Sequence, residues 1–377
     1  MKRCLLLLIL LLVLPVSAHA VELTLEAPSA LLMEKVTGEV LYAKNEHQPL
    51  EPASITKVMT LLLTMEAIEK GSIAYDDVVT VSAYAASMGG SNVYLAEGEQ
   101  ITVEELIKAV CVASGNDAAV ALAEHVSGVT ELFVEQMNNR ARELGMTDTH
   151  FVNCHGLPAE GHVSSAWDIA LMSRELILYH PDLRRFTTIW MDSLRGGEFE
   201  LANTNKLIRF YEGATGLKTG STSSAGYCIS ATAERDGMEL IAVVLHGSTS
   251  QQRFEDAKTM LNYGFSTYAL HTVELSEPLP DLPVHLGTED SVALQLSPAG
   301  RQVLLPKSQI STLTQATSLP EQVEAPIAAQ QQLGELTVRS GDTVVLEVPL
   351  VAAQAVEKLT WGEMLRRLLC ASFFLKM

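Results

Sequence analysis

The sequence is poor in basic residues. Its 377 residues include 26 lysines and arginines against 45 aspartates and glutamates, which gives a formal charge of −19. Contact with nucleic-acid phosphates needs a basic face, so this balance argues against a nucleic-acid-binding protein. Charged residues of both signs make up only 19% of the chain and hydrophobic residues 47%. Intrinsic disorder combines low hydrophobicity with high net charge, so it is excluded.

Cysteine is also scarce and irregularly placed. There are five cysteines, with no C-x-x-C pair. One of them, Cys4, belongs to the N-terminal segment discussed next. The other four are predicted to be small buried hydrophobic residues, and their spacing does not predict a disulfide: Cys111, Cys154, Cys228 and Cys370. A group of potential metal ligands fits no regular zinc spacing, so no metal or other cofactor is expected: His150, Cys154, His155 and His162.

The N-terminus carries an unbroken apolar run that is too short to span a bilayer. Leu5–Leu14 has ten residues, preceded by Lys2 and Arg3 and followed by the small-residue pattern Ala18-His19-Ala20. A transmembrane helix needs about 20 apolar residues. The pattern indicates a secretory signal peptide over residues 1–20, cleaved after about Ala20, rather than a short buried helix. The protein is therefore expected to be exported.

Residues 21–265 alternate between helix-like and strand-like segments. They are expected to form a helical cluster beside an antiparallel sheet whose strands come from both ends of this range. The strands are expected at 30–33, 40–42, 226–233 and 238–246, with a turn at Arg235-Asp236-Gly237. The helices are expected at 54–70, from 102 to about 110, and at 117–125, 132–144, 167–179 and 251–263.

The amino-acid composition and the residue pattern change after residue 265. More than half of the 14 prolines follow it, and short alternating segments such as 292–296 predict a small all-β domain over residues 266–355. The last segment, 356–377, mixes Trp361, leucines and phenylalanines with Arg366 and Arg367. The arginines argue against a membrane span. An amphipathic helix at a membrane surface fits better, the alternative being a helix docked on the β domain.

The first motif that carries chemistry is S-x-x-K, in Ser54-Ile55-Thr56-Lys57. Residues i and i+3 share one face of a helix, so Ser54 and Lys57 are expected to point into the same space. A serine hydroxyl needs a base to become a nucleophile. Burial and a second ammonium nearby, from Lys218, lower the pKa of a lysine and free its lone pair for that role. The helix start at Ser54 favours developing negative charge.

The second motif is S-x-N, in Ser114-Gly115-Asn116, and it is expected between two helices. A hydroxyl placed there can turn toward both Lys57 and Lys218 and relay a proton to a leaving amine. The amide of Asn116 offers a donor and an acceptor, which suits holding the peptide bond of a substrate.

The third motif is K-T-G, in Lys218-Thr219-Gly220, expected at the start of a strand. A strand edge gives an acyl substrate a β-type pairing surface, and Gly220 is expected to let the substrate approach closely. Lys218 and Thr219 suit a substrate carboxylate. The N–H groups of Ser221 and Ser54 are the predicted oxyanion hole.

The three motifs in this order form the signature of serine β-lactamases and penicillin-binding proteins. The chain resembles in particular the low-molecular-weight penicillin-binding proteins, the serine D-Ala-D-Ala carboxypeptidases. The similarity extends to the β domain, to the amphipathic C-terminus, and to these stretches: Pro52-Ala-Ser-Ile-Thr-Lys57, Ser114-Gly-Asn-Asp-Ala118, His155-Gly-Leu157, Ser164-Ser-Ala166 and Gly216-Leu-Lys-Thr-Gly220.

The resemblance implies an α/β (α+β) transpeptidase fold with a small C-terminal all-β domain, and a position at the outer face of the cytoplasmic membrane. It implies that Ser54 attacks the peptide bond between the last two D-alanines of the peptidoglycan pentapeptide stem, and that β-lactams acylate the same serine. It also implies that Arg253 helps to bind the terminal carboxylate, the alternative being a surface arginine. One departure stands out, because Cys154 lies where the resemblance leads us to expect proline.

Three alternatives to the carboxypeptidase differ in what they require of the sequence. A class A β-lactamase needs an E-x-x-L-N pattern between Asn116 and Lys218, and the sequence has none. An inactive scaffold protein is disfavoured because the serine and lysine residues of the motifs are intact. A DD-endopeptidase or transpeptidase of the same superfamily stays open, since these motifs do not determine whether water or an amine accepts the acyl group.

Overall fold

The computed structural model describes residues 23–372, and its centre is a five-stranded antiparallel sheet in the order β2-β1-β9-β8-β7. The predicted signal peptide lies outside the described residues. The sheet joins strands from both ends of the 21–265 range, as predicted. Its strands are β1 (Ser29–Glu34), β2 (Val40–Lys44), β7 (Ala214–Thr222), β8 (Gly226–Arg235) and β9 (Met238–Gly247).

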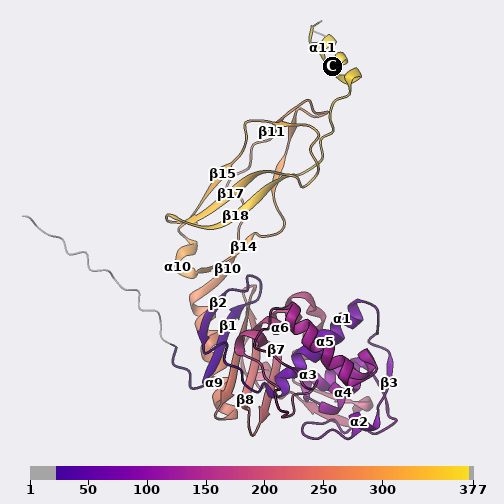
Figure 1. The fold of residues 1–377 in the computed structure, drawn as a ribbon. Helices are drawn as coiled ribbons and strands as arrows, with labels where there is room; N and C mark the ends of the chain where they lie inside the picture. The colour runs from indigo at the N-terminus through magenta and orange to yellow at the C-terminus, as the bar shows by residue number, and fades with distance from the viewer. Residues whose placement is uncertain (1–22, 373–377) are drawn as a thin grey trace, which may run out of the picture.

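Both faces of the sheet are covered, because successive side chains of a strand point to opposite faces. Leu31 of β1 packs into the helical cluster, whereas its neighbour Leu32 packs with Phe254 and Leu261 of α9 on the other face. Figure 1 shows the cluster beside one face and α9 along the other. The helices of the cluster are α1 (Lys57–Glu69), α3 (Val103–Val112), α4 (Asn116–Ser127), α5 (Thr130–Glu143) and α6 (Ala166–Tyr179), and α9 spans Ser250–Thr267.

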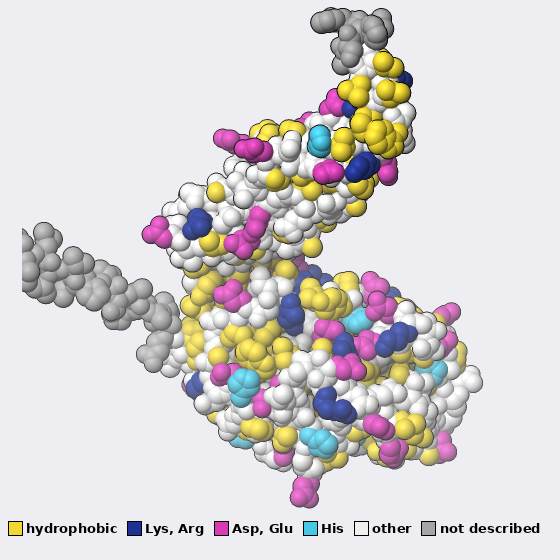
Figure 2. Space-filling view, turned by 45° about the horizontal axis from the view of Figure 1, so that its top comes forward, with side chains coloured by type: hydrophobic (Ala, Val, Ile, Leu, Met, Phe, Trp, Pro, Cys, Tyr) yellow, Lys and Arg dark blue, Asp and Glu magenta, His cyan; other side chains and the backbone are white. Residues whose placement is uncertain are grey.

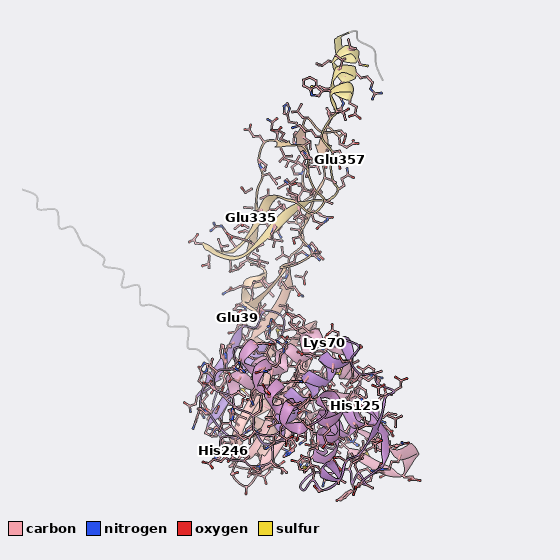
Figure 3. The ribbon with its side chains drawn as sticks, turned by 45° about the vertical axis from the view of Figure 1, so that its right-hand side comes forward. Glu39, Lys70, His125, His246, Glu335 and Glu357 are labelled. Carbon is pink, nitrogen blue, oxygen red and sulfur yellow. The ribbon has the colours of Figure 1, made fainter. Side chains whose placement is uncertain are left out.

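Most of these helices match the predicted ranges. The hydroxyl of Thr102 caps α3 by accepting the Glu105 N–H at 3.2 Å. Figure 3 shows Lys70, which follows α1, and His125, in the last turn of α4, on the surface of the cluster. The lysine side chain at the C-terminal end of α1 complements the helix dipole.

Two predicted boundaries differ in ways that affect the motifs. Ser54 is not the first residue of an α-helix, because it lies in a 3₁₀ turn, η1 (Ala53–Thr56), which precedes α1. The left-handed backbone of Ala53, with φ at 48°, fixes this tighter turn at the entrance. Lys218 lies in the middle of β7 rather than at its start, since the pairing with β8 already begins at Ala214.

The C-terminal part of the chain is rich in strands, as predicted. A four-stranded antiparallel sheet (β13-β18-β17-β15) and a mixed three-stranded sheet (β12-β11-β16), in which β11 and β16 are parallel, form it. Their strands are β11 (Leu282–His285), β12 (Ser291–Val292), β13 (Leu294–Leu296), β15 (Leu313–Ser318), β16 (Val323–Glu324), β17 (Gln332–Ser340) and β18 (Thr343–Ala352). Figure 3 marks Glu335 on β17 and Glu357 beyond β18. The predicted limit between residues 265 and 266 falls inside α9. The limits of the two domains stay predictions.

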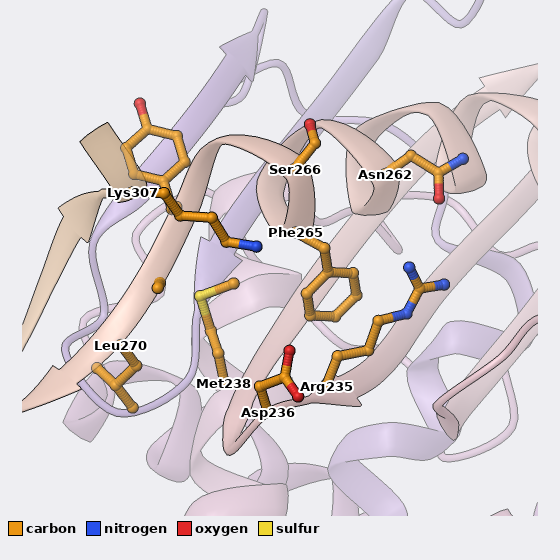
Figure 4. A pocket seen from close by; sticks show the side chains of 10 residues that line it. Arg235, Asp236, Met238, Asn262, Phe265, Ser266, Leu270 and Lys307 are labelled. Atoms are coloured by element: carbon orange, nitrogen blue, oxygen red, sulfur yellow. The ribbon is translucent and has the colours of Figure 1, made fainter. Parts of the chain in front are cut away.

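A two-stranded ribbon connects this part to the sheet and helices. It pairs β10 (Tyr268–Thr272) with β14 (Gln302–Pro306), and Leu304 packs with the residues that cover the α9 face of the sheet. Beside the ribbon lies a cavity of about 400 Å³ (Figure 4), with the ring of Phe265 in its wall and Lys307 at its edge. The Arg235 guanidinium in this cavity stacks 4.8 Å from that ring. None of the motif residues lines it.

The chain ends in α11 (Trp361–Ser372), which lies far from the five-stranded sheet (Figure 1). Its apolar side chains are exposed, Trp361 by 85%, and they form a yellow group at the top of Figure 2. Arg367 contacts the β-rich part, donating to Asp290 Oδ1 at 2.7 Å and to the Thr288 carbonyl. Within residues 23–372, no helix has the length and apolar character needed to cross a membrane.

Candidate active site

The ammonium group of Lys57 brings two of the motifs together. It is fully buried, and its Nζ donates to Ser54 Oγ at 3.0 Å, Asn116 Oδ1 at 2.6 Å and the His155 carbonyl at 2.7 Å. Ser54 and Lys57 share a face, as the i, i+3 spacing predicts, although a 3₁₀ turn and not an α-helix carries the serine. The three contacts account for every N–H of the ammonium form.

Two buried lysines face the same region, and each has a lowered pKa. Burial lowers the pKa of Lys57 well below its usual value, and the nearby charge of Lys218 lowers it further. Burial, together with Arg253, lowers the pKa of Lys218 to about 7. Both causes act as expected, because desolvation and a like charge each disfavour the ammonium form. Lys218 Nζ itself donates to the carbonyl of its neighbour Thr219 at 3.0 Å.

Ser114 lies between α3 and α4, where the sequence places it. It is buried and its backbone is left-handed, with φ at 63°. Within the described part of the chain its hydroxyl makes no hydrogen bond, so the predicted contact with both lysines is absent from this structure. The reason on the Lys57 side is that Ser54, Asn116 and the His155 carbonyl already occupy its three donors.

Asn116 holds its neighbours as well as offering polar groups. Its Oδ1 accepts from Lys57, and its Nδ2 donates to the Gly89 carbonyl at 2.6 Å. A Cβ atom on Gly90 would lie 2.8 Å from that Nδ2, so the 89–90 loop passes close to the amide. The asparagine therefore ties this loop to the buried lysine.

The K-T-G segment lies on β7, the edge strand of the sheet. The prediction of a strand edge therefore agrees with the topology. A Cβ atom on Gly220 would lie 2.8 Å from the Pro52 carbonyl oxygen and 3.0 Å from Ser54 N. The close approach that glycine allows within this structure is to the turn that carries Ser54, and its approach to a substrate stays a prediction. Thr219 Oγ1 donates to Thr204 Oγ1 at 2.7 Å, and Ser221 is exposed.

Arg253 is buried, so the alternative of a surface arginine is wrong. Its Nη1 donates to the carbonyls of Gly220 at 2.9 Å and Cys228 at 3.3 Å, which places the guanidinium against the K-T-G strand. Burial lowers its pKa to about 10. Among the described residues it forms no ion pair with a carboxylate. A buried cation without a counter-ion is expensive unless an anion joins it.

Sequence reasoning missed the part that one loop plays in this site. The carbonyl of His155 binds Lys57, and Gly156 lies against the 3₁₀ turn, so closely that a Cβ atom would be 1.9 Å from the Ala53 oxygen. In the sequence, His155-Gly156-Leu157 contributes only to the family resemblance. A main-chain carbonyl leaves no signature in a side-chain pattern, whereas the glycine was the available signal.

The cysteines support packing rather than bonding. All four cysteines in the described part of the chain are free, and Cys111, Cys154 and Cys228 are buried while Cys370 is half-buried. Burial raises the pKa of Cys154 to about 12, so its thiol stays protonated although it lies near Lys57. Across residues 23–372, no three His, Cys, Asp or Glu side chains are grouped to hold a metal ion.

A helical cluster against an antiparallel sheet, with a serine and a buried lysine between them and a K-T-G edge strand, defines the penicillin-binding protein fold. Residues 16–249 match the family model described as D-alanyl-D-alanine carboxypeptidase. Residues 272–358 match that of the penicillin-binding protein 5 C-terminal domain. The chain belongs to the D-alanyl-D-alanine carboxypeptidase family and is a serine peptidase of that class.

Individual relatives agree with this assignment over nearly the whole chain. The D-alanyl-D-alanine carboxypeptidase DacF of Bacillus subtilis is 41% identical over 350 residues, covering 92% of this chain and 90% of the relative. The crystal structure of penicillin-binding protein 5 from Haemophilus influenzae is 30% identical with a TM-score of 0.77, covering 90% of this chain and 100% of that protein. Ampicillin-bound penicillin-binding protein D2 from Listeria monocytogenes is 34% identical with a TM-score of 0.60, covering 64% of this chain and 99% of that protein.

Proposed function

We propose that this carboxypeptidase removes the terminal D-alanine of peptidoglycan pentapeptide stems through an acyl-enzyme on Ser54. The observation that carries the proposal is the 3.0 Å contact between Ser54 Oγ and Lys57 Nζ, made by a fully buried lysine with a lowered pKa. A nucleophile hydrogen-bonded to a base, with the base held by further groups, is the arrangement that nucleophilic catalysis requires.

In the acylation step the neutral form of Lys57 accepts the Ser54 proton. A neutral amine keeps two N–H donors, which match Asn116 Oδ1 and the His155 carbonyl, and its lone pair then faces Ser54 Oγ. Oγ forms a bond to the carbonyl carbon of the penultimate D-alanine. The C–N bond to the last residue breaks, and its nitrogen takes up a proton, so that D-alanine leaves.

The edge strand binds the end of the substrate. The N–H groups of Ser54 and Ser221 form the oxyanion hole. The terminal carboxylate binds to Lys218, Thr219 and Arg253, which supply two cations and a hydroxyl beside β7. The buried Arg253, which lacks a carboxylate partner among the described residues, supports this role because a bound anion would compensate its charge.

Ser114 and Asn116 act on the leaving group and the acyl side. The Ser114 hydroxyl, which makes no hydrogen bond within the described residues, is available to relay the proton from Lys57 to the departing amine. Asn116 holds Lys57 and presents its amide to the substrate peptide bond. Water then attacks the acyl-enzyme, the shortened stem leaves with a new carboxylate, and Ser54 recovers its proton.

The same serine is the proposed target of β-lactam antibiotics, which acylate it and block the stem peptide. Support comes from the relative whose structure was determined with ampicillin, penicillin-binding protein D2 of Listeria monocytogenes. The β-lactam ring opens as Ser54 Oγ bonds to its carbonyl carbon, and the ring nitrogen takes the proton. The resulting acyl-enzyme retains the leaving group, which keeps it at the site.

The direct test is D-alanine release from a pentapeptide ending in D-Ala-D-Ala, together with the mass of a penicillin adduct. We expect stoichiometric D-alanine and an adduct on the tryptic peptide 45–57, which contains Ser54 and ends at Lys57. An adduct elsewhere, or none, would contradict the assignment of Ser54. Transfer of the acyl group to an added amine, without free acid, would favour the transpeptidase alternative.

We further propose that the exported protein is held at the outer face of the cytoplasmic membrane by α11. The exposed Trp361, Leu365 and Leu369 suit the acyl boundary of a bilayer, and the exposed Arg366 suits anionic headgroups. The signal peptide over residues 1–20 is the proposed export signal.

A truncated chain tests this attachment. A protein that ends at Val356 is expected to lose at least about ten-fold in binding to vesicles with anionic lipid, because it lacks the apolar face of α11. Vesicle co-sedimentation measures the effect. Unchanged D-alanine release from a soluble peptide is the control, and equal vesicle binding by both chains would contradict the proposal.

A further inference from the structure

A buried histidine is connected by hydrogen bonds to the turn that carries Ser54. His162 is 2% exposed and lies in the loop that also contains His155 and Gly156. Its Nδ1 accepts the Val152 N–H at 2.9 Å, and its Nε2 lies 2.8 Å from Thr56 Oγ1. Because Nδ1 accepts, the neutral ring carries its proton on Nε2, which therefore donates to the threonine.

Thr56 passes the contact to the residue before Ser54. Its hydroxyl accepts from His162 and donates to the Ala53 carbonyl at 2.8 Å. The Thr56 hydroxyl thus both accepts and donates a hydrogen bond, and these two bonds fix its orientation. The link joins the 150–163 loop to the peptide group between Ala53 and Ser54.

This turn needs such support. Ala53 has φ at 48°, in the left-handed region that costs an ordinary residue roughly 1–2 kcal/mol. Residues held in such conformations persist only where their surroundings determine them. Gly220 limits the turn on one side and Gly156 on another, but both act only by contact. The Thr56 hydroxyl instead binds the Ala53 oxygen and gives its peptide plane a defined orientation.

We propose that His162 is a positioning residue for acylation: through the Thr56 hydroxyl it orients the Ala53 carbonyl and so holds Ser54 Oγ and Ser54 N in place. The proposal rests on the proposed role of Ser54 as the nucleophile. His162 makes no hydrogen bond to Ser54 or Lys57 in the described structure, so it does not exchange protons with them. Misplacement of a reacting group by about 1 Å can cost on the order of 10²-fold in rate.

The charge state of His162 is compatible with this role. Burial lowers its pKa to about 4, with a contribution from His150. The ring is therefore neutral near pH 7, and the hydrogen-bond directions described above hold in that state. His155, the other histidine of the loop, also has a pKa lowered to about 4, mainly by burial.

Two substitutions separate positioning from packing. His162→Phe keeps a ring but removes both hydrogen bonds. His162→Gln supplies an acceptor for Val152 N–H and a donor for Thr56. We expect the phenylalanine variant to lower kcat and the rate of penicillin acylation by about 10- to 100-fold with KM within about three-fold, because the proposed carboxylate site on β7 is untouched. The glutamine variant is expected to recover most of the rate.

A double-mutant cycle tests the path through the threonine. Thr56→Val removes the hydroxyl at nearly constant volume, and we expect the same loss as for His162→Phe. The double variant is expected to be no slower than either single one, since both remove the same link. Multiplying effects would overturn the proposal, as would a His162→Phe enzyme with kcat within two-fold of the wild type, or a folded glutamine variant as slow as phenylalanine.

The controls separate this proposal from general damage and from the proposed function. His180→Phe makes the same change at another buried histidine, one whose Nδ1 lies 3.4 Å from Glu69 Oε2, and it is expected to keep kcat. Ser54→Ala sets the background. If the wild type itself neither releases D-alanine nor takes up penicillin at Ser54, the proposed function fails first. If His162→Phe does not fold, Thr56→Val and His162→Gln still decide the outcome.

Discussion

Replacement of Lys57 by methionine is expected to slow acylation of Ser54 by about 10²- to 10⁴-fold, the usual contribution of a general base. Methionine keeps much of the apolar stem but cannot accept the serine proton. The fold should survive, because losing the donor to Asn116 and the His155 carbonyl, about 1–3 kcal/mol for each unsatisfied group, is offset by no longer burying an amine.

The measurement is the rate of labelled-penicillin uptake as a function of pH. Neutral Lys57 is the reactive form, so wild-type acylation rises with pH through the pKa of this lysine, which burial and Lys218 hold well below its usual value. The acylation rate of the methionine variant should not show this rise with pH. Lys70→Met, at an exposed lysine just after α1, is the matched control. A variant within ten-fold of the wild type would remove Lys57 from the role of base.

The predictable part of the site is the part that side-chain spacing determines. Ser54 and Lys57 face one another because residues three apart share a side of a helical turn, in a 3₁₀ turn as in an α-helix. A strand at Lys218 was predicted from the K-T-G motif, and that residue lies on the edge strand β7. These contacts depend on residue type and local periodicity, which a sequence displays.

The remaining part depends on the main chain and on long-range packing. Lys57 binds the His155 carbonyl across 98 positions, and no side-chain pattern marks a carbonyl. Gly220 was assigned to substrate approach, yet the nearest atoms belong to the turn at Pro52 and Ser54. A glycine signals a close approach but not its partner, since the partner is set by tertiary packing.

Secondary structure shows the same division. Long segments such as α6 and β9 were predicted to within about two residues, because each contains enough apolar residues in sequence to be recognised without knowledge of its partners. The paired strands β3 (Val78–Thr80) and β4 (Gln100–Thr102), and likewise β5 (Met191–Leu194) and β6 (Phe199–Ala202), were missed. Three or four residues are too few to show a period, so such strands depend on their partners.

Gly156→Ala is expected to destabilise the fold strongly, although the residue lies outside the motifs. Its φ of 87° is left-handed, which costs an alanine about 1–2 kcal/mol. The new Cβ would also lie 1.9 Å from the Ala53 oxygen, and overpacking of this kind costs about 1–3 kcal/mol more. We expect the free energy of unfolding to fall by about 2–5 kcal/mol in urea titrations. Penicillin uptake should fall as well, since any relief displaces the Ser54 turn.

Gly161→Ala in the same loop separates the two causes. Its φ is 79°, but the nearest atom to an added Cβ is His150 Cδ2 at 3.9 Å, so it carries the strain without the collision. This variant should lose only about 1–2 kcal/mol and acylate normally. Equal losses in both variants would mean that the turn yields to the methyl group at no cost. A stable Gly156→Ala enzyme with slow acylation would instead show that the loop serves the position of Ser54 more than the stability of the fold.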